Sequence, residues 1–175
     1  DEASNDEFTN DFFKNVESDI VIQILPTSPF ISSTEIKDFV KKFVYDGLDT
    51  LISMVDVQIE SMYEGKPINF NQKKITPPSQ TLEPIKAYGC SLMGWRKNNY
   101  FKNIEKYGAA YHGGDGKIDF FTLKGLSTID IDNEEEFQLA EFVARSLSKN
   151  KIFTKRYYGE EHSEVDVPEI LSNDG

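Results

Sequence analysis

Two stretches near the beginning of the chain share one pattern, in which a helix-periodic segment is followed by a short β-branched run. Each helical segment opens with a capping box, Ser4 with Glu7 and Ser32 with Glu35, where serine and glutamate satisfy each other's unpaired backbone amides. The pattern predicts helices at about 4–16 and 33–46 and strands at 19–25 and 50–55. The order helix, strand, helix, strand requires crossover connections, so it predicts an α/β domain with a mainly parallel sheet. The β-branched run from Asp19 to Leu25 is typical of a strand that is buried on both faces.

The composition restricts the function classes. A chain of 175 residues with 38% hydrophobic and 13% aromatic residues fits one folded domain with a sizeable core. A formal charge of -11 disfavours a general nucleic-acid or membrane binder, since such partners require clustered lysine and arginine. Cys90 is the single cysteine, so no internal disulfide can form, and no apolar run has the length of a membrane span. A cytoplasmic location is the simplest expectation.

The rest of the chain reads as a continuation of the same domain, which we place at 1–150 with a tail at 151–175. Glycine and proline are frequent between about 58 and 84, where we predict an inserted hairpin and an extended loop. Further strands and helices are predicted at Tyr88–Met93, Asn99–Lys106, Ile118–Leu123 and Asn133–Ser148.

The segment Asp130-Ile131-Asp132 is the first candidate site. In an extended backbone the two carboxylates project to one side, because side chains alternate along a strand. Mg²⁺ commonly takes one or two carboxylates and completes its ligand shell with water and substrate phosphates. The alternative is that Asp132 caps the helix that begins at Asn133 while Asp130 is merely solvated.

Weaker candidates lie elsewhere. The turn Pro26-Thr27-Ser28-Pro29 follows a predicted parallel strand, at the edge where open α/β sheets bind ligands. Lys86 and Arg96 flank the Tyr88 strand and are the best cations for an anionic sugar or phosphate, although such residues are commonly just solvated.

Three segments together resemble a known family. They are Leu25-Pro-Thr-Ser-Pro-Phe30, Ser79-Gln80-Thr-Leu-Glu-Pro84 before Tyr88, and Leu126-Ser-Thr-Ile-Asp-Ile-Asp132 before an acidic helix. Their order and spacing resemble the N-acylneuraminate cytidylyltransferases, the CMP-sialic acid synthetases, over most of 19–148.

The resemblance implies a Rossmann-like nucleotidyltransferase fold and a homodimer in which the insertion at about 58–84 reaches across to the partner. It implies transfer of CMP from CTP to a sialic acid with release of pyrophosphate, with Mg²⁺ on Asp130 and Asp132 as the catalytic and metal-binding pair. The substrate-binding residues that it suggests are Gln23, Thr27, Ser28, Gln80 and Lys86.

The chain also departs from the family pattern. Many members have glutamine directly before Pro-Thr-Ser-Pro, whereas Leu25 stands here and Gln23 lies two residues earlier on the same strand face. Lys86 stands where an arginine is common, and lysine cannot clamp a carboxylate with two parallel hydrogen bonds. The family's N-terminal nucleotide loop, rich in glycine, serine and lysine, has no counterpart in these residues.

These departures leave alternatives open. The chain is interpreted as an N-terminally truncated enzyme, with a non-catalytic dimerising or sugar-binding homologue as the rival hypothesis. Within the enzyme class, the rival to sialic acid is another acidic sugar such as Kdo.

Overall fold

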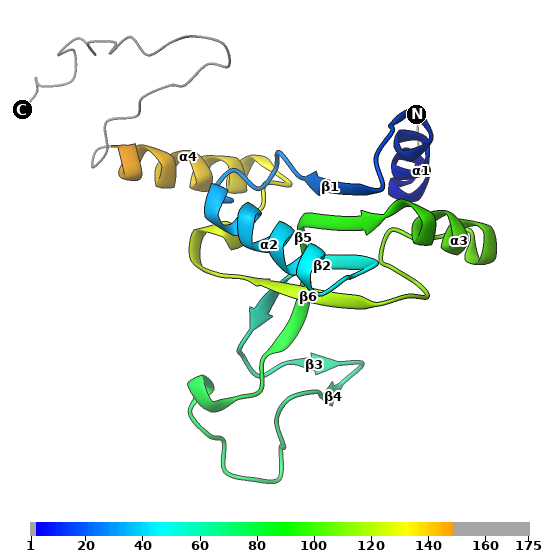
Figure 1. Ribbon diagram of the computed structural model, residues 1–175. Helices are drawn as coiled ribbons and strands as arrows, with labels where there is room; N and C mark the ends of the chain where they lie inside the picture. The colour runs from blue at the N-terminus through cyan, green and yellow to red at the C-terminus, as the bar shows by residue number, and fades with distance from the viewer. Residues whose placement is uncertain (1–2, 149–175) are drawn as a thin grey trace, which may run out of the picture. The chain divides into compact units, whose positions relative to one another are not determined.

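The computed structural model describes residues 3–148, except the side chain of Cys90, and the predicted tail at 151–175 lies outside these residues. The chain divides into two compact units, Asp1–Asp132 and Asn133–Gly175. The first unit contains a central sheet, three helices and a projecting arm (Figure 1). Its helices are α1 (Asn5–Asn15), α2 (Ser33–Tyr45) and α3 (Lys97–Tyr107). Its strands are β1 (Ile20–Ile24), β2 (Thr50–Val57), β3 (Met62–Tyr63), β4 (Lys66–Pro67), β5 (Ile85–Arg96) and β6 (Ile118–Leu123).

The four-stranded sheet has the order β1-β5-β2-β6. Strand β5 pairs antiparallel with both β1 and β2, whereas β2 pairs parallel with β6. Three of the strands therefore run in one direction and only β5 runs against them. The α/β class and the mainly parallel strand direction predicted from the sequence are confirmed.

The prediction that the first strand is buried on both faces is wrong. Within the described residues β1 pairs with β5 alone, so it is an edge strand, and its residues are half-buried except the exposed Ile24. The β-branched run reflects strand propensity and packing against helices, and such a run does not distinguish a central from an edge position.

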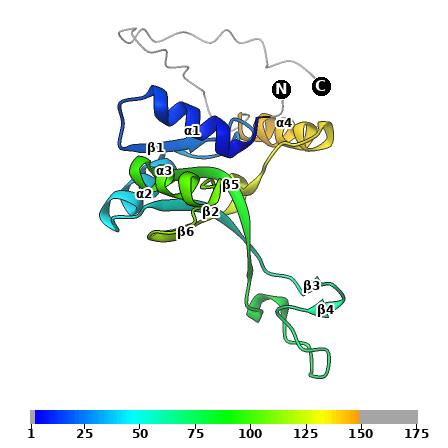
Figure 2. The same cartoon turned by 90° about the vertical axis from the view of Figure 1, so that its right-hand side faces the viewer.

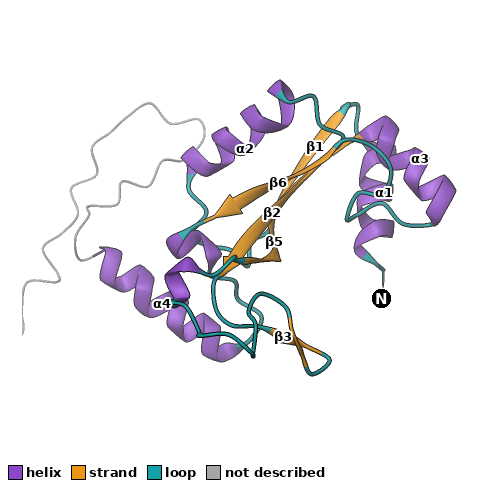
Figure 3. Ribbon diagram, turned by 90° about the horizontal axis from the view of Figure 1, so that it is seen from below, coloured by secondary structure: helices purple, strands orange, loops and turns teal. Residues whose placement is uncertain are grey.

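Helix α2 packs on one face of the sheet (Figure 3). Phe39 and Phe43 of α2 contact a buried cluster that includes Leu51, Leu92 and Leu123 from three strands. Both capping-box bonds predicted at Ser32 and Glu35 are present at the start of the helix. The close packing depends on Gly94 of β5, where a Cβ would lie 3.1 Å from the Phe43 ring.

Helices α1 and α3 pack on the opposite face, since Leu92 and Met93 of β5 point to opposite sides. Phe13 of α1 lies against Tyr100 of α3, with ring centroids 5.2 Å apart. The buried indole of Trp95 donates to the carbonyl of Tyr111 at 2.9 Å. The two faces of the sheet are thus covered by separate aromatic clusters, as a two-sided α/β sheet requires.

The predicted insertion is an arm that projects away from the sheet (Figures 1 and 2). It contains the hairpin β3-β4, whose turn places Glu64 and Gly65 at φ values of 48° and 74°. Several apolar side chains of the arm are exposed in the described chain, namely Ile59, Met62, Tyr63, Ile68 and Ile75.

The second unit contains helix α4 (Glu134–Ser148). The Asn133 side chain accepts from the amide of Glu136 at 3.1 Å, and the Glu136 carboxylate accepts from the amide of Asn133 at 3.2 Å. Asn133 therefore caps the helix, so the alternative in which Asp132 is the cap is wrong.

Candidate functional site

The loop after β1 and the segment after β6 meet at the edge of the sheet where the three parallel strands end. The Ser28 hydroxyl lies 3.2 Å from Oδ1 of Asp130, and the amide of Ile131 donates to the carbonyl oxygen of Thr27 at 3.0 Å. Since β6 and β1 are at opposite ends of the strand order, residues 124–132 must cross this edge to reach Ser28. The crossing places a carboxylate where ligands bind in open α/β sheets.

The crossing segment is held at its middle by α2. A 3₁₀ turn at Gly125–Thr128 contains the buried Ser127, whose hydroxyl donates to the carbonyl of Lys124 at 2.7 Å. Burial raises the pKa of the Glu35 carboxyl, but hydrogen bonds with Ser127 and Ser32 outweigh it, so this pKa lies below its ordinary value. The carboxylate of Glu35, in the first turn of α2, thus lies close to Ser127 in the segment that carries Asp130.

Asp130 and Asp132 differ in their surroundings. Asp130 is half-buried beside Ser28, so it is not simply solvated, whereas Asp132 is exposed at a bend. The predicted extended segment does not join the sheet, because its backbone bonds the Thr27 loop instead of a strand. Asp130 and Asp132 both lie in the segment that bonds the Thr27 loop, and of the two the Asp130 carboxylate lies 3.2 Å from the Ser28 hydroxyl.

Ser28 is more buried than a substrate contact usually is. Its side chain is 4% exposed, and its hydroxyl lies 2.8 Å from the hydroxyl of Ser91 as well as near Asp130. Thr27 and Gln23 are half-buried, and Gln23 lies on β1 opposite Met93. Of the residues suggested by the sequence, the structure therefore joins Thr27, Ser28 and Asp130 directly.

Gln80 and Lys86 make their contacts elsewhere. The carbonyl of Gln80 accepts from the Gln58 side chain at 2.9 Å, within the arm. The ammonium group of Lys86 pairs with Asp56 and lies 3.3 Å from the Thr122 hydroxyl. Lys86 precedes Ser91 by five residues on β5. Gln80 thus lies within the arm, whereas Lys86 lies where β2 and β6 end, and these bonds of the two residues are to groups other than Ser28 and Asp130.

Arg96 lies at the opposite end of β5 from that edge. Its guanidinium group is 5.8 Å from the centre of the Phe43 ring and 3.8 Å from Oδ1 of Asp49. A contact of Arg96 with a ligand at Ser28 and Asp130 is therefore not possible in this arrangement.

Ser91 is a member of the cluster that the sequence did not indicate. It is 2% exposed, and its carbonyl also accepts from the amide of Leu25 at 3.0 Å. Its only sequence signal is the glycine at position 89, because glycine within a strand often marks a bulge.

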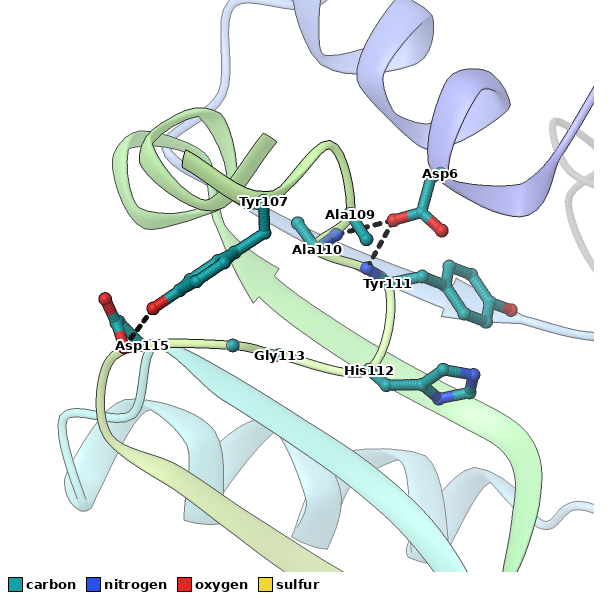
Figure 4. Close-up of a pocket in the computed structure, with 9 residues that line it drawn as sticks. Asp6, Tyr107, Ala109, Ala110, Tyr111, His112, Gly113 and Asp115 are labelled. Carbon is teal, nitrogen blue, oxygen red and sulfur yellow. Dashed lines mark hydrogen bonds between the residues drawn. The ribbon is translucent and has the colours of Figure 1, made fainter. Parts of the chain in front are cut away.

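A separate cavity of about 410 Å³ lies between the start of α1, the end of α3 and residues 109–115 (Figure 4). Its carboxylates are engaged in holding the fold together. Oδ1 of Asp6 accepts from the amides of Ala110 and Tyr111, and Asp115 bonds Lys106 and Tyr107. These bonds tie two helices to one loop, so they explain the cavity's polar groups without a ligand.

The metal-binding capacity of the Asp130 edge is limited. Within residues 3–148, no group of three or more histidine, cysteine, aspartate or glutamate side chains is placed to hold a metal ion. Two carboxylates are still adequate for Mg²⁺ when a phosphorylated substrate and water supply the remaining ligands.

No helix in the described part of the chain combines the length and apolarity that a membrane span needs.

No protein-family model matches the chain, and no curated protein matches its sequence. Solved structures do resemble it. The bifunctional IspDF from Campylobacter jejuni aligns with a TM-score of 0.55 and 12% identity, over 79% of this chain and 35% of that one. The 4-diphosphocytidyl-2C-methyl-D-erythritol synthase from Anaerococcus prevotii aligns with a TM-score of 0.52 and 12% identity, over 82% and 67%.

A third similar structure is CMP:2-keto-3-deoxy-manno-octonic acid synthetase complexed with CTP. It aligns with a TM-score of 0.53 and 13% identity, over 86% of this chain and 70% of that chain. This chain thus spans about a third of the bifunctional protein and about two thirds of the other two. At such low identity the likeness concerns the fold alone. It shows that this chain has the nucleotidyltransferase type of α/β fold.

Proposed function

We propose that this chain is a CTP-dependent cytidylyltransferase that transfers CMP to an acidic sugar and releases pyrophosphate. The observation that carries the proposal is the junction of Thr27 and Ser28 with Asp130 and Ile131 at the carboxyl edge of the sheet. A carboxylate held at this edge suits a metal that binds phosphates. The same fold occurs in two enzymes named for cytidyl products, one of them complexed with CTP.

The residues present fit Mg²⁺. Asp130 and Asp132 would hold it, and the bond to Ser28 restricts the rotation of the Asp130 carboxylate. Mg²⁺ bound there would orient the triphosphate and neutralise charge that develops during transfer. The carboxylates serve as ligands in this scheme and need not act as bases.

In the reaction, a hydroxyl oxygen of the sugar attacks the α-phosphorus of CTP. The bond from that phosphorus to the oxygen bridging to the β-phosphate breaks, pyrophosphate leaves, and the hydroxyl proton passes to solvent. Thr27 and Gln23 are the nearest predicted sugar contacts, because both are half-buried near the end of β1. The buried Ser28 supports Asp130 from within the loop.

We propose that the chain forms a homodimer in which Gln80 and Lys86 contribute to the partner's sugar site. Both lie on the arm or at its base, and the arm exposes apolar side chains, Ile75 being 96% exposed. An arm that crosses to a second copy would cover these side chains and bring Gln80 and Lys86 toward the partner's sugar site. The ammonium group of Lys86 pairs with Asp56 in one copy, so a contact with the sugar carboxylate would require Lys86 to leave or share that ion pair.

N-acylneuraminate is the first candidate sugar and Kdo the second. Both are acids that a lysine can attract, and the likeness to a Kdo-activating synthetase supports the second as well as the first. A panel of sugar acids has to decide between them.

A non-catalytic sugar-binding or dimerising role is the second candidate function. The observation in its favour is that, among the described residues, the bonds of Ser28, Ser91 and Asp130 involve no lysine or arginine. A triphosphate at this edge would depend on metal and on groups beyond this cluster for its positive charge.

The test is pyrophosphate release from CTP and Mg²⁺ with sialic acids and Kdo, using wild type, Asp130→Ala and Asp132→Ala. Each variant should reduce the rate by more than about 100-fold, since even outer-shell partners of a metal are worth about 10–100-fold. Asp38→Ala is the matched control, because Asp38 is exposed on α2 and pairs with Lys41 at 3.7 Å.

An unchanged rate in both aspartate variants would refute the metal assignment. Absence of pyrophosphate release with every sugar acid, together with retained binding of a sugar acid in calorimetry, would instead support the non-catalytic role.

A further inference from the structure

Strand β5 contains a large irregularity beside the Asp130 site. Ile52 pairs with Met93 and Met54 pairs with Tyr88, so two steps along β2 are matched by five along β5. The extra residues of β5 form a bulge. The buried Ser53 hydroxyl accepts from the amide of Leu92 at 3.0 Å. Bulges commonly redirect a side chain next to an active site.

The side chain that this bulge redirects is Ser91. Its hydroxyl lies 2.8 Å from that of Ser28, and Ser28 in turn lies 3.2 Å from Oδ1 of Asp130. Ser91 is also 3.0 Å from the carbonyl of Gly89. Both serines are nearly inaccessible to solvent, so water cannot substitute for either hydroxyl.

The number of hydroxyl protons limits which of these contacts can be hydrogen bonds at the same time. Each serine has one hydroxyl proton, whereas the three contacts among Gly89, Ser91, Ser28 and Asp130 would need three. A hydrogen bond to an ionised carboxylate is about twice as strong as one between neutral groups. The Ser28 proton is therefore drawn to Asp130 rather than to Ser91, and the 2.8 Å contact is then a hydrogen bond if Ser91 donates its proton to Ser28 instead of to the carbonyl of Gly89.

We infer that Ser91 is a positioning residue for metal binding, acting on Asp130 through Ser28. The inference rests on the proposed function, since it assumes that Asp130 is a metal ligand. The Ser91 hydroxyl fixes the Ser28 hydroxyl in the orientation that donates to Asp130. This bond holds the Asp130 carboxylate in one orientation before a metal binds. Metal binding therefore costs less conformational entropy.

Binding of Mn²⁺ alone, followed by its electron paramagnetic resonance signal in the full chain, tests the inference without substrate. Ser91→Ala should weaken Mn²⁺ binding about 10-fold, the usual scale for outer-shell partners. Ser28→Ala should weaken it at least as much. The double variant should bind like Ser28→Ala, because Ser91 acts through Ser28 and the two losses do not add.

Two further variants separate positioning from general damage. Ser53→Ala removes the other buried bulge hydroxyl, so it should lower the urea midpoint while Mn²⁺ affinity stays at the wild-type value. Ser91→Thr keeps a hydroxyl and should recover most of the affinity. If Ser91→Ala does not fold, Ser91→Cys replaces it, with a similar volume, a weaker donor and a smaller expected loss.

The outcomes distinguish this inference from the function beneath it. Wild-type affinity in Ser91→Ala, or additive losses in the double variant, would overturn the role of Ser91 while Asp130→Asn still abolished binding. Failure of wild type to bind Mn²⁺, or binding that Asp130→Asn leaves intact, would overturn the metal site itself and the inference with it.

Discussion

The backbone amide of Ile131 donates to the carbonyl oxygen of Thr27 across 3.0 Å, so the loop after β1 and the segment after β6 are joined by main chain. This bond lies directly beside the contact between Ser28 and Asp130. The position of the Asp130 carboxylate is therefore set by backbone as well as by side chains.

Replacing Ile131 by proline should displace Asp130, because proline has no amide proton to donate. We expect Ile131→Pro to weaken Mn²⁺ binding and to lower the free energy of unfolding by about 0.5–1.5 kcal/mol, the net contribution of a typical intramolecular hydrogen bond. Ile131→Ala is the control, since it keeps the amide and should retain Mn²⁺ affinity. Equal affinities in the two variants would contradict the role of this bond.

Gly94 allows α2 to approach the sheet closely. A Cβ at this position would lie 2.9 Å from Cδ1 of Ile22 and 3.1 Å from the Phe43 ring. Gly94→Ala should therefore lower stability by about 1–3 kcal/mol through overpacking, measured by urea denaturation. Ile22→Val removes the nearest carbon, so the cost of Gly94→Ala should be smaller in that background. An equal cost in both backgrounds would show that the crowding lies elsewhere.

The capping box at α2 provides a matched pair of serines. Ser32 accepts from the amide of Glu35 at 3.2 Å, whereas Ser33 is the exposed first residue of the helix. Ser32→Ala should destabilise the domain by about 1 kcal/mol and Ser33→Ala by a few tenths at most. Because Glu35 also bonds Ser127, the Ser32 variant should additionally lower Mn²⁺ affinity slightly.

The pair of Lys42 and Asp119 predicts an acid-sensitive contribution to stability. The hydrogen bond from Lys42 holds the pKa of Asp119 below its ordinary value of 3.8. A carboxyl group with a depressed folded-state pKa stabilises the fold above its unfolded pKa, and that contribution is lost as pH falls through the folded value. Asp119→Asn should cost about 0.2–1 kcal/mol at pH 7, because the pair is partly exposed.

Urea midpoints of wild type and Asp119→Asn should converge as the pH is lowered toward 2. A difference that is constant with pH would mean that the Asp119 charge does not contribute.

Because the arm exposes apolar side chains, we expect the chain to assemble in a concentration-dependent way. Ile75→Asp and Tyr63→Asp place charges on side chains that are 96% and 66% exposed, so neither should reduce the stability of the monomer by more than about 0.5 kcal/mol. If the arm joins two copies, sedimentation should show wild type as a dimer and these variants as monomers. Tyr45→Asp, 84% exposed on α2, is the control and should leave the assembly unchanged.

Much of the architecture follows from local sequence. Serine and glutamate three residues apart determine where α1 and α2 begin, because the capping bonds form within one turn. Asp130 is likewise marked in the sequence by the Asp-Ile-Asp spacing after Leu126-Ser127-Thr128 and before an acidic helix. Such features depend on residues that are neighbours along the chain.

Features that depend on residues far apart in the chain follow from the tertiary fold. The edge position of β1, the reversal of β5 and the bulge that turns Ser91 toward Ser28 follow from how strands pair, which the pattern of apolar residues does not encode. The buried serines show this most clearly, since Ser28, Ser91 and Asp130 come from three separate segments. A hydroxyl in a strand or turn has no distinctive sequence pattern, and its partner is fixed only when the sheet forms.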